Sequence, residues 1–280
     1  MRWTRGHRSA NVEDRRGGGG RMIRGAGGMG LGTLVLLVIL SLIFKRDFLS
    51  LVGGGGLETA PETAAGPPAQ TTPEEEELVA FVSYVLDDAQ NVWQQQLGQS
   101  FRPANLVLFR DAVQSACGFA ESATGPFYCP GDEKVYIDLG FYQELQQRFG
   151  APGDFAQAYV LAHEIGHHVQ NVLGTEAEVR RARTTRADLA NELSVRLELQ
   201  ADCYAGVWGH SAAQRNRLET GDVEEGLGAA AAVGDDRLQR MGGGRVVPES
   251  FTHGSSQQRQ EWFQRGLQSG RPEDCDTFRG

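Results

Sequence analysis

Two histidines four residues apart, with a glutamate next to the first, are the part of this sequence that most clearly predicts chemistry. They are His163, Glu164 and His167, in a stretch with helical spacing of apolar residues. Residues i and i+4 of a helix are about 400° apart, so both imidazoles lie on one face. This arrangement is typical of two zinc ligands, with Glu164 placed to take a proton from the catalytic water. The alternative, two ordinary histidines beside an exposed glutamate, is disfavoured because only 6 His occur in 280 residues.

A hydrolytic zinc site also needs a third protein ligand and one open position. We predict that Glu198 is this ligand, because it begins the segment ELQAD in the next long helix. Asp202 lies one turn further on the same face, where it can accept the free ring N–H of His163 and fix the orientation of that ring. Four other residues with ligating side chains fit this geometry less well: His168, Glu192, Cys203 and His210.

These motifs carry a family resemblance. HEIGHHVQ followed by ELQADCYAG resembles the bacterial putative neutral zinc metallopeptidase family, the YpfJ-like proteins, and the likeness extends through SACGFAESATGPFYCP, VYIDLGFY and THGSSQQR. The wider likeness is to gluzincin metallopeptidases, in which one helix supplies two histidines and a second helix supplies a glutamate. The resemblance implies a Zn²⁺ ion held by His163, His167 and Glu198, with Glu164 as general base.

A second resemblance concerns the segment THGSSQQR. It is similar to a stretch of membrane CAAX-type zinc proteases that has a histidine and, six residues later, an arginine, both facing the substrate. The resemblance implies that His253 and Arg259 have a catalytic role, because hydrolysis builds negative charge on the carbonyl oxygen. The alternative is a capping loop with a surface arginine, since Ser255 and Gln258 have the spacing of a capping box.

The helices and strands that must position these residues follow from periodicity and capping signals. The sequence predicts helices over residues 73–98, 141–149, 155–173, 185–208 and 223–241, and a last helix that opens at Ser255. It predicts strands over residues 105–109 and 134–139. The expected fold class is therefore α+β, a mainly helical zincin-like metallopeptidase domain with a small sheet. The second strand either pairs with an extended peptide substrate or is a core strand, and both interpretations stay open.

An apolar run near the N-terminus predicts a transmembrane helix. Residues 25–44 carry no charge, and 20 residues just span a bilayer core. Residues 1–24 contain seven arginines against Glu13 and Asp14, a balance of +5, so the positive-inside rule puts them in the cytoplasm. We therefore expect a single-pass protein of the cell membrane, with a basic cytoplasmic tail (1–24), a transmembrane helix (25–44), a flexible linker (45–73) and an extracytoplasmic zinc metallopeptidase domain (74–280). A cleaved signal peptide is disfavoured, because no small-x-small cleavage site follows the run.

Charge and cysteine content limit the partners. The net charge is −9, so the chain beyond the +5 segment carries −14, which argues against nucleic acid as a partner. The four cysteines include no C-x-x-C pair, so a four-thiolate zinc site is unsupported. Outside the membrane, disulfides are permitted, and we expect Cys117 to pair with Cys129 and Cys203 with Cys275. The alternative is four free buried thiols.

Together, these features indicate a membrane-anchored zinc metalloendopeptidase that hydrolyses a peptide or protein substrate with Glu164 as general base. One alternative is a catalytically silent zinc-binding envelope protein that acts as a binding or scaffolding module. Another is a zinc hydrolase that acts on a non-peptide bond. Glu164 argues against the silent protein, because a structural zinc site needs no base. The substrate, the cleavage preference and the oligomeric state leave no signal in the sequence.

Overall fold

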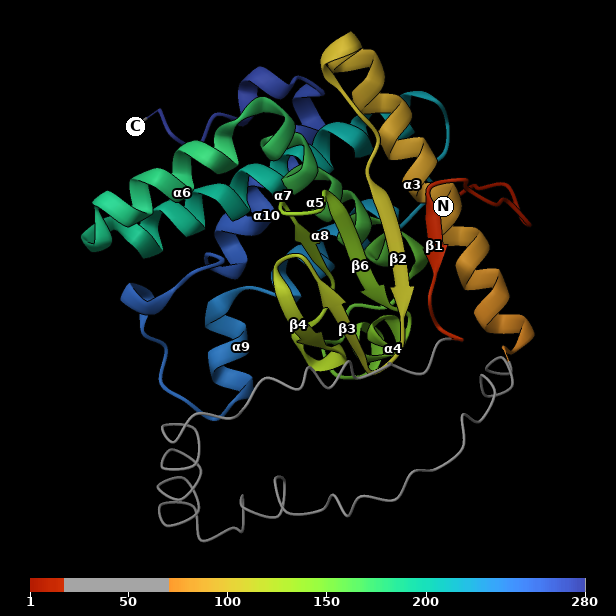
Figure 1. The fold of residues 1–280 in the computed structure, drawn as a ribbon, viewed down its shortest axis with the longest axis horizontal. Coiled ribbons are helices and arrows are strands. Elements are labelled where there is room, and N and C mark those ends of the chain that lie inside the picture. The colour runs from red at the N-terminus through yellow and green to blue at the C-terminus, as the bar shows by residue number, and fades with distance from the viewer. Residues whose placement is uncertain (18–70, 280) are drawn as a thin grey trace, which may run out of the picture. The chain divides into compact units, whose positions relative to one another are not determined.

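The computed structural model describes residues 1–17 and 71–279, which form a mainly helical α+β fold with a small sheet (Figure 1). The helices are α3 (Pro73–Leu97), α4 (Gly140–Gln147), α5 (Asp154–Leu173), α6 (Thr175–Thr185), α7 (Ala190–Gln214), α8 (Asp222–Ala232), α9 (Asp235–Met241) and α10 (Ser256–Ser269). The strands are β1 (Val12–Asp14), β2 (Asn105–Phe109), β3 (Ala112–Ser115), β4 (Gly118–Glu121), β5 (Phe127–Cys129) and β6 (Lys134–Asp138).

The main sheet has the strand order β1-β2-β6-β5, in which β1, β2 and β6 are parallel and β5 is antiparallel to β6. Alternate side chains of β2 and β6 point to opposite faces, as the strand period requires. Leu106 and Ile137 join the large core shared with α3 and α5, whereas Val107 and Tyr136 join a smaller cluster with Val113 of β3. β2 pairs with all five residues of β6 on one side, and β5 pairs with Lys134, Val135 and Tyr136 on the other, so β6 lies between two strands over those three residues.

Two predicted helices are divided in the structure. The range 185–208 belongs mostly to α7, which begins at Ala190 after the separate helix α6. The range 223–241 is split into α8 and α9 at Gly234. A Cβ atom on Gly234 would lie only 2.4 Å from the backbone nitrogen of Ser256, so this contact needs glycine. The break turns the start of α9 toward residues 252–254, where the Asp235 N–H donates to the Gly254 carbonyl at 2.9 Å.

The N-terminal residues belong to the same folded unit as the rest of the described chain. In β1, Val12 pairs with Leu106 of β2, and residues 1–16 and 70–280 form one compact unit. Strands that share backbone hydrogen bonds lie on the same side of any membrane. The expected localisation, with a cytoplasmic N-terminus and the catalytic domain outside, is therefore wrong.

Arginines that led to the prediction of a cytoplasmic tail form ion pairs within the fold. Arg16 is buried and contacts Glu75 at 2.9 Å and Glu76 at 3.1 Å, and Arg8 contacts Glu76 at 2.8 Å. These glutamates form the acidic first turn of α3, where negative charge also favours the helix dipole. The positive charge of Arg8 and Arg16 therefore balances an acidic helix start within the fold, and the positive-inside rule does not apply to these two residues.

The transmembrane part of the expected fold class is also corrected. Within residues 1–17 and 71–279, no helix has both the length and the apolar character needed to cross a bilayer. The predicted span 25–44 itself lies outside the described residues, as does nearly all of the predicted linker 45–73. The description that holds is a mainly helical α+β fold with a small sheet.

Candidate metal centre

Three side chains from two helices converge in the interior of the fold. His163 and His167 lie on α5 and Glu198 lies on α7, and one ligand atom from each lies within 4.8 Å of the other two. The Nε2 atom of His163 is 3.2 Å from one carboxylate oxygen of Glu198, and Nε2 of His167 is 3.5 Å from the other. Two imidazole nitrogens and one carboxylate that face a common point are a donor set that suits zinc in hydrolytic sites.

The other ring nitrogen of each histidine is already engaged. Nδ1 of His163 lies 2.8 Å from Oδ1 of Asp202, and Nδ1 of His167 lies 2.8 Å from Oε1 of Gln170. Because both partners are acceptors, each Nδ1 carries the proton, which leaves Nε2 free to bind a metal. The sequence predicted Asp202 in this role. It did not predict Gln170, although the position three residues after His167 lies close to the same helix face.

The charges of the cluster favour a cation beside Glu198. Burial opposes protonation of His167, yet the Glu198 carboxylate raises the pKa of this imidazole to about 10. Burial likewise opposes ionisation of Glu198, but His167 holds the pKa of the carboxyl well below its usual range. The site therefore accommodates positive charge, as a divalent cation requires.

Asp202 is the centre of a fully buried network. Its carboxylate accepts hydrogen bonds from the Tyr159 hydroxyl, from Arg259 Nε at 2.8 Å and from Arg259 Nη2 at 2.9 Å. Burial opposes the charge of Asp202, but Arg259 and His163 keep its pKa below the ordinary value. Arg259 is itself only 3% exposed. The structure thus places Arg259 against both Asp202 and the ring of His163. The part played by Tyr159 was not predicted from the sequence.

Close contacts between helix backbones bring these residues together. A Cβ atom on Gly166 of α5 would lie 2.9 Å from the Ala201 carbonyl oxygen of α7. A Cβ atom on Gly266 of α10 would lie 1.9 Å from the Cys203 carbonyl oxygen, also on α7. Only glycine allows such approaches. As a result, α7 lies against both α5 and α10, so that Glu198 meets side chains of α5 and Asp202 meets side chains of both helices.

Glu164 is buried on α5 beside His163. Burial raises the pKa of its carboxyl, although His163 and His167 act in the opposite direction. A raised pKa brings a carboxylate closer to the range that suits a general base. The position and the pKa both fit the role that the sequence predicted.

His253 lies in a loop that Asp235 holds in place. One oxygen of Asp235 accepts from the backbone N–H groups of Thr252 at 2.7 Å, His253 at 2.7 Å and Gly254 at 3.1 Å. Its other oxygen lies 3.1 Å from Nδ1 of His253. This hydrogen bond raises the pKa of His253, and the charge of Glu198 adds to the effect. His253 is half exposed and is not part of the ligand cluster.

Both expected disulfides are present, Cys117–Cys129 and Cys203–Cys275. The first joins residues near the β3–β4 hairpin and the outer strand β5. The second joins α7 to the C-terminal segment, which is the part of the chain after α10.

A second acidic group, made of Asp154, Asp222 and Glu225, contains no histidine, and the Met1 ammonium lies 2.6 Å from Asp154. The cation beside these carboxylates is therefore an amine of the chain itself.

Comparisons with known proteins identify a family and several similar proteins. The family model described as "Putative neutral zinc metallopeptidase" matches residues 1–278. The "Uncharacterized protein YpfJ" of Escherichia coli strain K12 is 47% identical over 289 residues, which cover 99% of each chain. The "Uncharacterized protein Rv2575" of Mycobacterium tuberculosis strain H37Rv is 47% identical over 198 residues, or 67% of this chain and 66% of that one. No solved structure matches significantly.

Proposed function

The chain belongs to the putative neutral zinc metallopeptidase family, and from this membership we propose that it is a zinc-dependent endopeptidase whose metal is held by His163, His167 and Glu198. The observation that carries the proposal is the convergence of two Nε2 atoms on the Glu198 carboxylate, with both Nδ1 atoms bonded elsewhere. The expected substrate is a peptide or a protein.

The reaction that this arrangement supports is hydrolysis of an amide bond. Zinc bound to such a ligand set polarises a carbonyl group and lowers the pKa of water. Glu164 accepts the proton of the attacking water and passes it to the leaving amine. Its burial supports this role, because a raised pKa makes the Glu164 carboxylate a better proton acceptor, and the leaving amine, which is a stronger base still, can then take the proton.

His253 donates a hydrogen bond to the oxyanion that forms on the substrate. The Asp235 carboxylate supports this role in two ways: it orients the ring through Nδ1, and it raises the pKa of the imidazole. Nε2 then remains as the donor toward the substrate. Such a donor contributes on the order of 10²-fold to the rate in other hydrolases.

Glu164→Gln tests the proposal. The substitution should leave the zinc content near one ion per chain and lower the rate of peptide cleavage by roughly 10²–10⁴-fold, because it removes only the base. Digestion of a mixed peptide library, read by mass spectrometry beside metal analysis of the same samples, measures both. Glu224→Gln, which changes an exposed residue in the first turn of α8, is the matched control and should cleave like the wild type. Normal turnover by Glu164→Gln at full zinc content would refute the assignment.

A further inference from the structure

The two histidines have unlike partners behind them. His163 bonds to a carboxylate, Asp202, whereas His167 bonds to a neutral amide, Gln170. Gln170 is completely buried, so its amide must find all its partners inside the fold. The identity of those partners shows what the residue connects.

Gln170 makes three of the four hydrogen bonds that an amide side chain allows. Its Oε1 atom accepts from Nδ1 of His167, and its Nε2 atom donates to the Leu197 carbonyl at 2.7 Å and to Oε1 of Gln200 at 3.1 Å. Leu197 immediately precedes the ligand Glu198. One side chain therefore contacts both the ring of one ligand and the backbone beside another.

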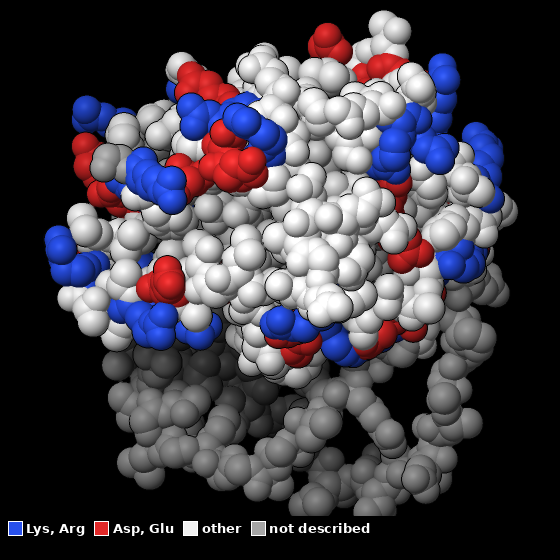
Figure 2. Space-filling view, turned by 90° about the horizontal axis from the view of Figure 1, so that it is seen from above, with Lys and Arg blue, Asp and Glu red and all other residues white. Residues whose placement is uncertain are grey.

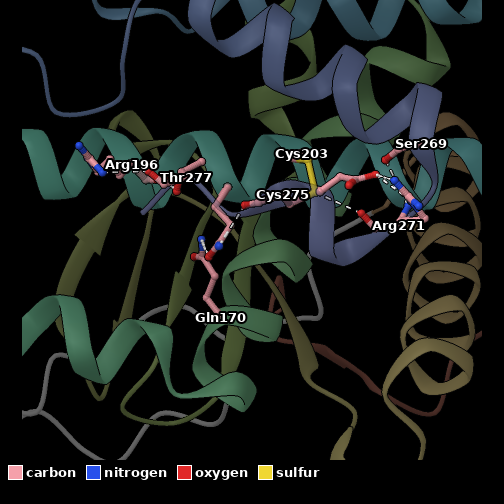
Figure 3. The surroundings of a disulfide bond; sticks show 9 residues. Gln170, Arg196, Cys203, Ser269, Arg271, Cys275 and Thr277 are labelled. Carbon is pink, nitrogen blue, oxygen red and sulfur yellow. Dashed lines mark hydrogen bonds and ion pairs between the residues drawn. A yellow bond between two sulfur atoms is a disulfide. The ribbon is translucent and has the colours of Figure 1, made fainter. Parts of the chain in front are cut away.

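Gln200 extends this series of hydrogen bonds to the C-terminal segment. It is 5% exposed, and its Nε2 atom donates to the Cys275 carbonyl at 3.1 Å. Figure 3 shows Gln170 on the side of α7 toward α5, and Cys275 held to the same helix by its bond to Cys203.

The C-terminal segment is attached to α7 at a second point. The Thr277 hydroxyl donates to the Arg196 carbonyl at 2.7 Å, and the Arg196 guanidinium donates to the Thr277 carbonyl at 3.1 Å (Figure 3). The disulfide and these bonds fix the segment over the turn of α7 that carries Glu198 and Gln200. The Cys275 carbonyl is thus a stationary acceptor.

We propose that Gln170 is a positioning residue for His167, and that the hydrogen bonds from His167 through Gln170 and Gln200 to Cys275 make the metal affinity depend on the disulfide-anchored C-terminal segment. The proposal rests on the proposed metal centre. A buried partner of a ligating imidazole fixes its tautomer and direction, and its loss typically lowers metal affinity by about 10–100-fold. The amide of Gln170 can fix the His167 ring without adding a charge to the site. The one negative charge behind the two histidines is that of Asp202, behind His163.

Gln170→Met is the first test, because methionine keeps a similar volume and removes every bond of the amide. We expect zinc binding, measured by competition with a chromogenic chelator, to weaken by about 10–100-fold. The visible spectrum of the cobalt-loaded variant should change as well, because the direction of the His167 ring changes. A merely structural loss would lower the melting temperature of the metal-free protein without changing this spectrum.

Two further variants interrupt the same series of hydrogen bonds at points further from the metal. They are Gln200→Met and the double variant Cys203→Ser/Cys275→Ser. Both should weaken zinc binding in the same direction by a smaller factor. The matched control is Cys117→Ser/Cys129→Ser, which removes the other disulfide and should bind zinc like the wild type. If Gln170→Met does not fold, Gln200→Met decides the matter by the same measurement.

The outcomes separate this proposal from the one on which it rests. Wild-type protein that binds no stoichiometric zinc would overturn the metal centre, and this proposal with it. Wild-type zinc affinity and an unchanged cobalt spectrum in Gln170→Met, or unchanged affinity in Gln200→Met where that variant decides, would overturn this proposal alone. Equal weakening by removal of either disulfide would also overturn it, since the effect would then be one of general stability.

Discussion

At the scale of single residues, Asp202 illustrates how the site combines expected and unexpected contacts. Sequence spacing alone placed Asp202 one helical turn from Glu198 and behind His163, and the structure has this contact at 2.8 Å. Tyr159 and Gln170 were not predicted, because a tyrosine and a glutamine in a buried helix have no signature until their partners are known. The direction of Arg259 was likewise invisible, since it depends on how α10 lies against α7.

Removal of Arg259 is expected to destabilise the fold. Arg259→Ala leaves the buried Asp202 carboxylate without its cation, which typically costs about 3–5 kcal/mol of the free energy of unfolding. Urea denaturation of the metal-free protein measures this loss. The double variant Arg259→Met/Asp202→Asn should recover much of it, because the uncompensated charge is then absent. A stable Arg259→Ala protein with normal zinc binding and a reduced cleavage rate would instead favour a direct role in the transition state.

The Asp235–His253 pair predicts a pH dependence. The pKa of His253 is raised above its ordinary value, so the contribution of the pair to stability is fully present below that ordinary value and disappears as the pH rises through the raised pKa. The pKa of Asp235 is lowered, since its bonds to His253 outweigh the effect of burial, so the contribution also disappears as the pH falls through that lowered value. The difference in unfolding free energy between wild type and His253→Gln should therefore be largest in mildly acid solution. A difference that stays constant up to strongly alkaline pH would contradict the pairing.

At the scale of elements, close backbone contacts hold three helices around the site. Besides Gly166 and Gly266, a Cβ atom on Gly206 of α7 would lie 2.1 Å from the Phe263 carbonyl oxygen and 2.7 Å from the Leu267 nitrogen of α10. Both neighbours are backbone atoms, which cannot move aside as a flexible side chain can. The crossing of α7 and α10 therefore depends on glycine on both helices.

Gly206→Val should separate α7 from α10. We expect either no folded protein or a loss of more than about 3 kcal/mol of stability, together with weaker zinc binding, because Arg259 moves away from Asp202. Circular dichroism melts and metal analysis measure the two effects. Gly228→Ala on α8 is the control: a Cβ atom there meets nothing within 4 Å, so stability should be unchanged or higher by up to about 1 kcal/mol. A stable Gly206→Val variant with normal zinc affinity would show that the crossing tolerates a side chain.

Elements with a strong local pattern were predictable from the sequence, and elements defined by distant contacts were not. The helix over 155–173 carries clear periodicity and the strand over 105–109 is a short apolar run, and both were found within a residue or two. The separation of α8 from α9 depends on Gly234 meeting Ser256 across the fold, which no local pattern reveals. Strand β1 is a three-residue piece of an arginine-rich stretch, and it is a strand only because β2 lies beside it.

At the scale of the whole molecule, the charged surface gives little information about function. On the face seen in Figure 2, groups of acidic and basic side chains lie near one another around a broad uncharged area. Exposed ion pairs of this kind contribute roughly 0–1 kcal/mol each. The stability of the described unit therefore comes mainly from its core, to which the N-terminal segment contributes Met1 and, in part, Trp3 and Val12.

Deletion of residues 1–16 should destabilise the whole unit. The deletion removes β1 from the sheet, uncovers an edge of β2 and takes Met1 from the main core. We expect a lower melting temperature, and aggregation through the exposed edge of β2. Thermal melts and light scattering of protein that keeps the rest of the chain measure the two effects. Arg5→Ala is the control, because the Arg5–Glu77 pair is largely exposed and its loss should matter little. A truncated protein with wild-type melting behaviour would mean that β1 is dispensable.

The pairing of β1 with β2 also sets an order of events during folding. Val12 is synthesised long before its partner Leu106, so β1 must wait while the chain between them, including α3, is made. Closing such a long loop before any contact rewards it is entropically costly, whereas the chain between β2 and β6, which are also parallel, is much shorter. The β2–β6 pair and the helices behind it can therefore form first, with β1 added afterwards. During that interval the edge of β2 is open, and the unfinished sheet is the stage at which this chain is most exposed to pairing with a neighbour.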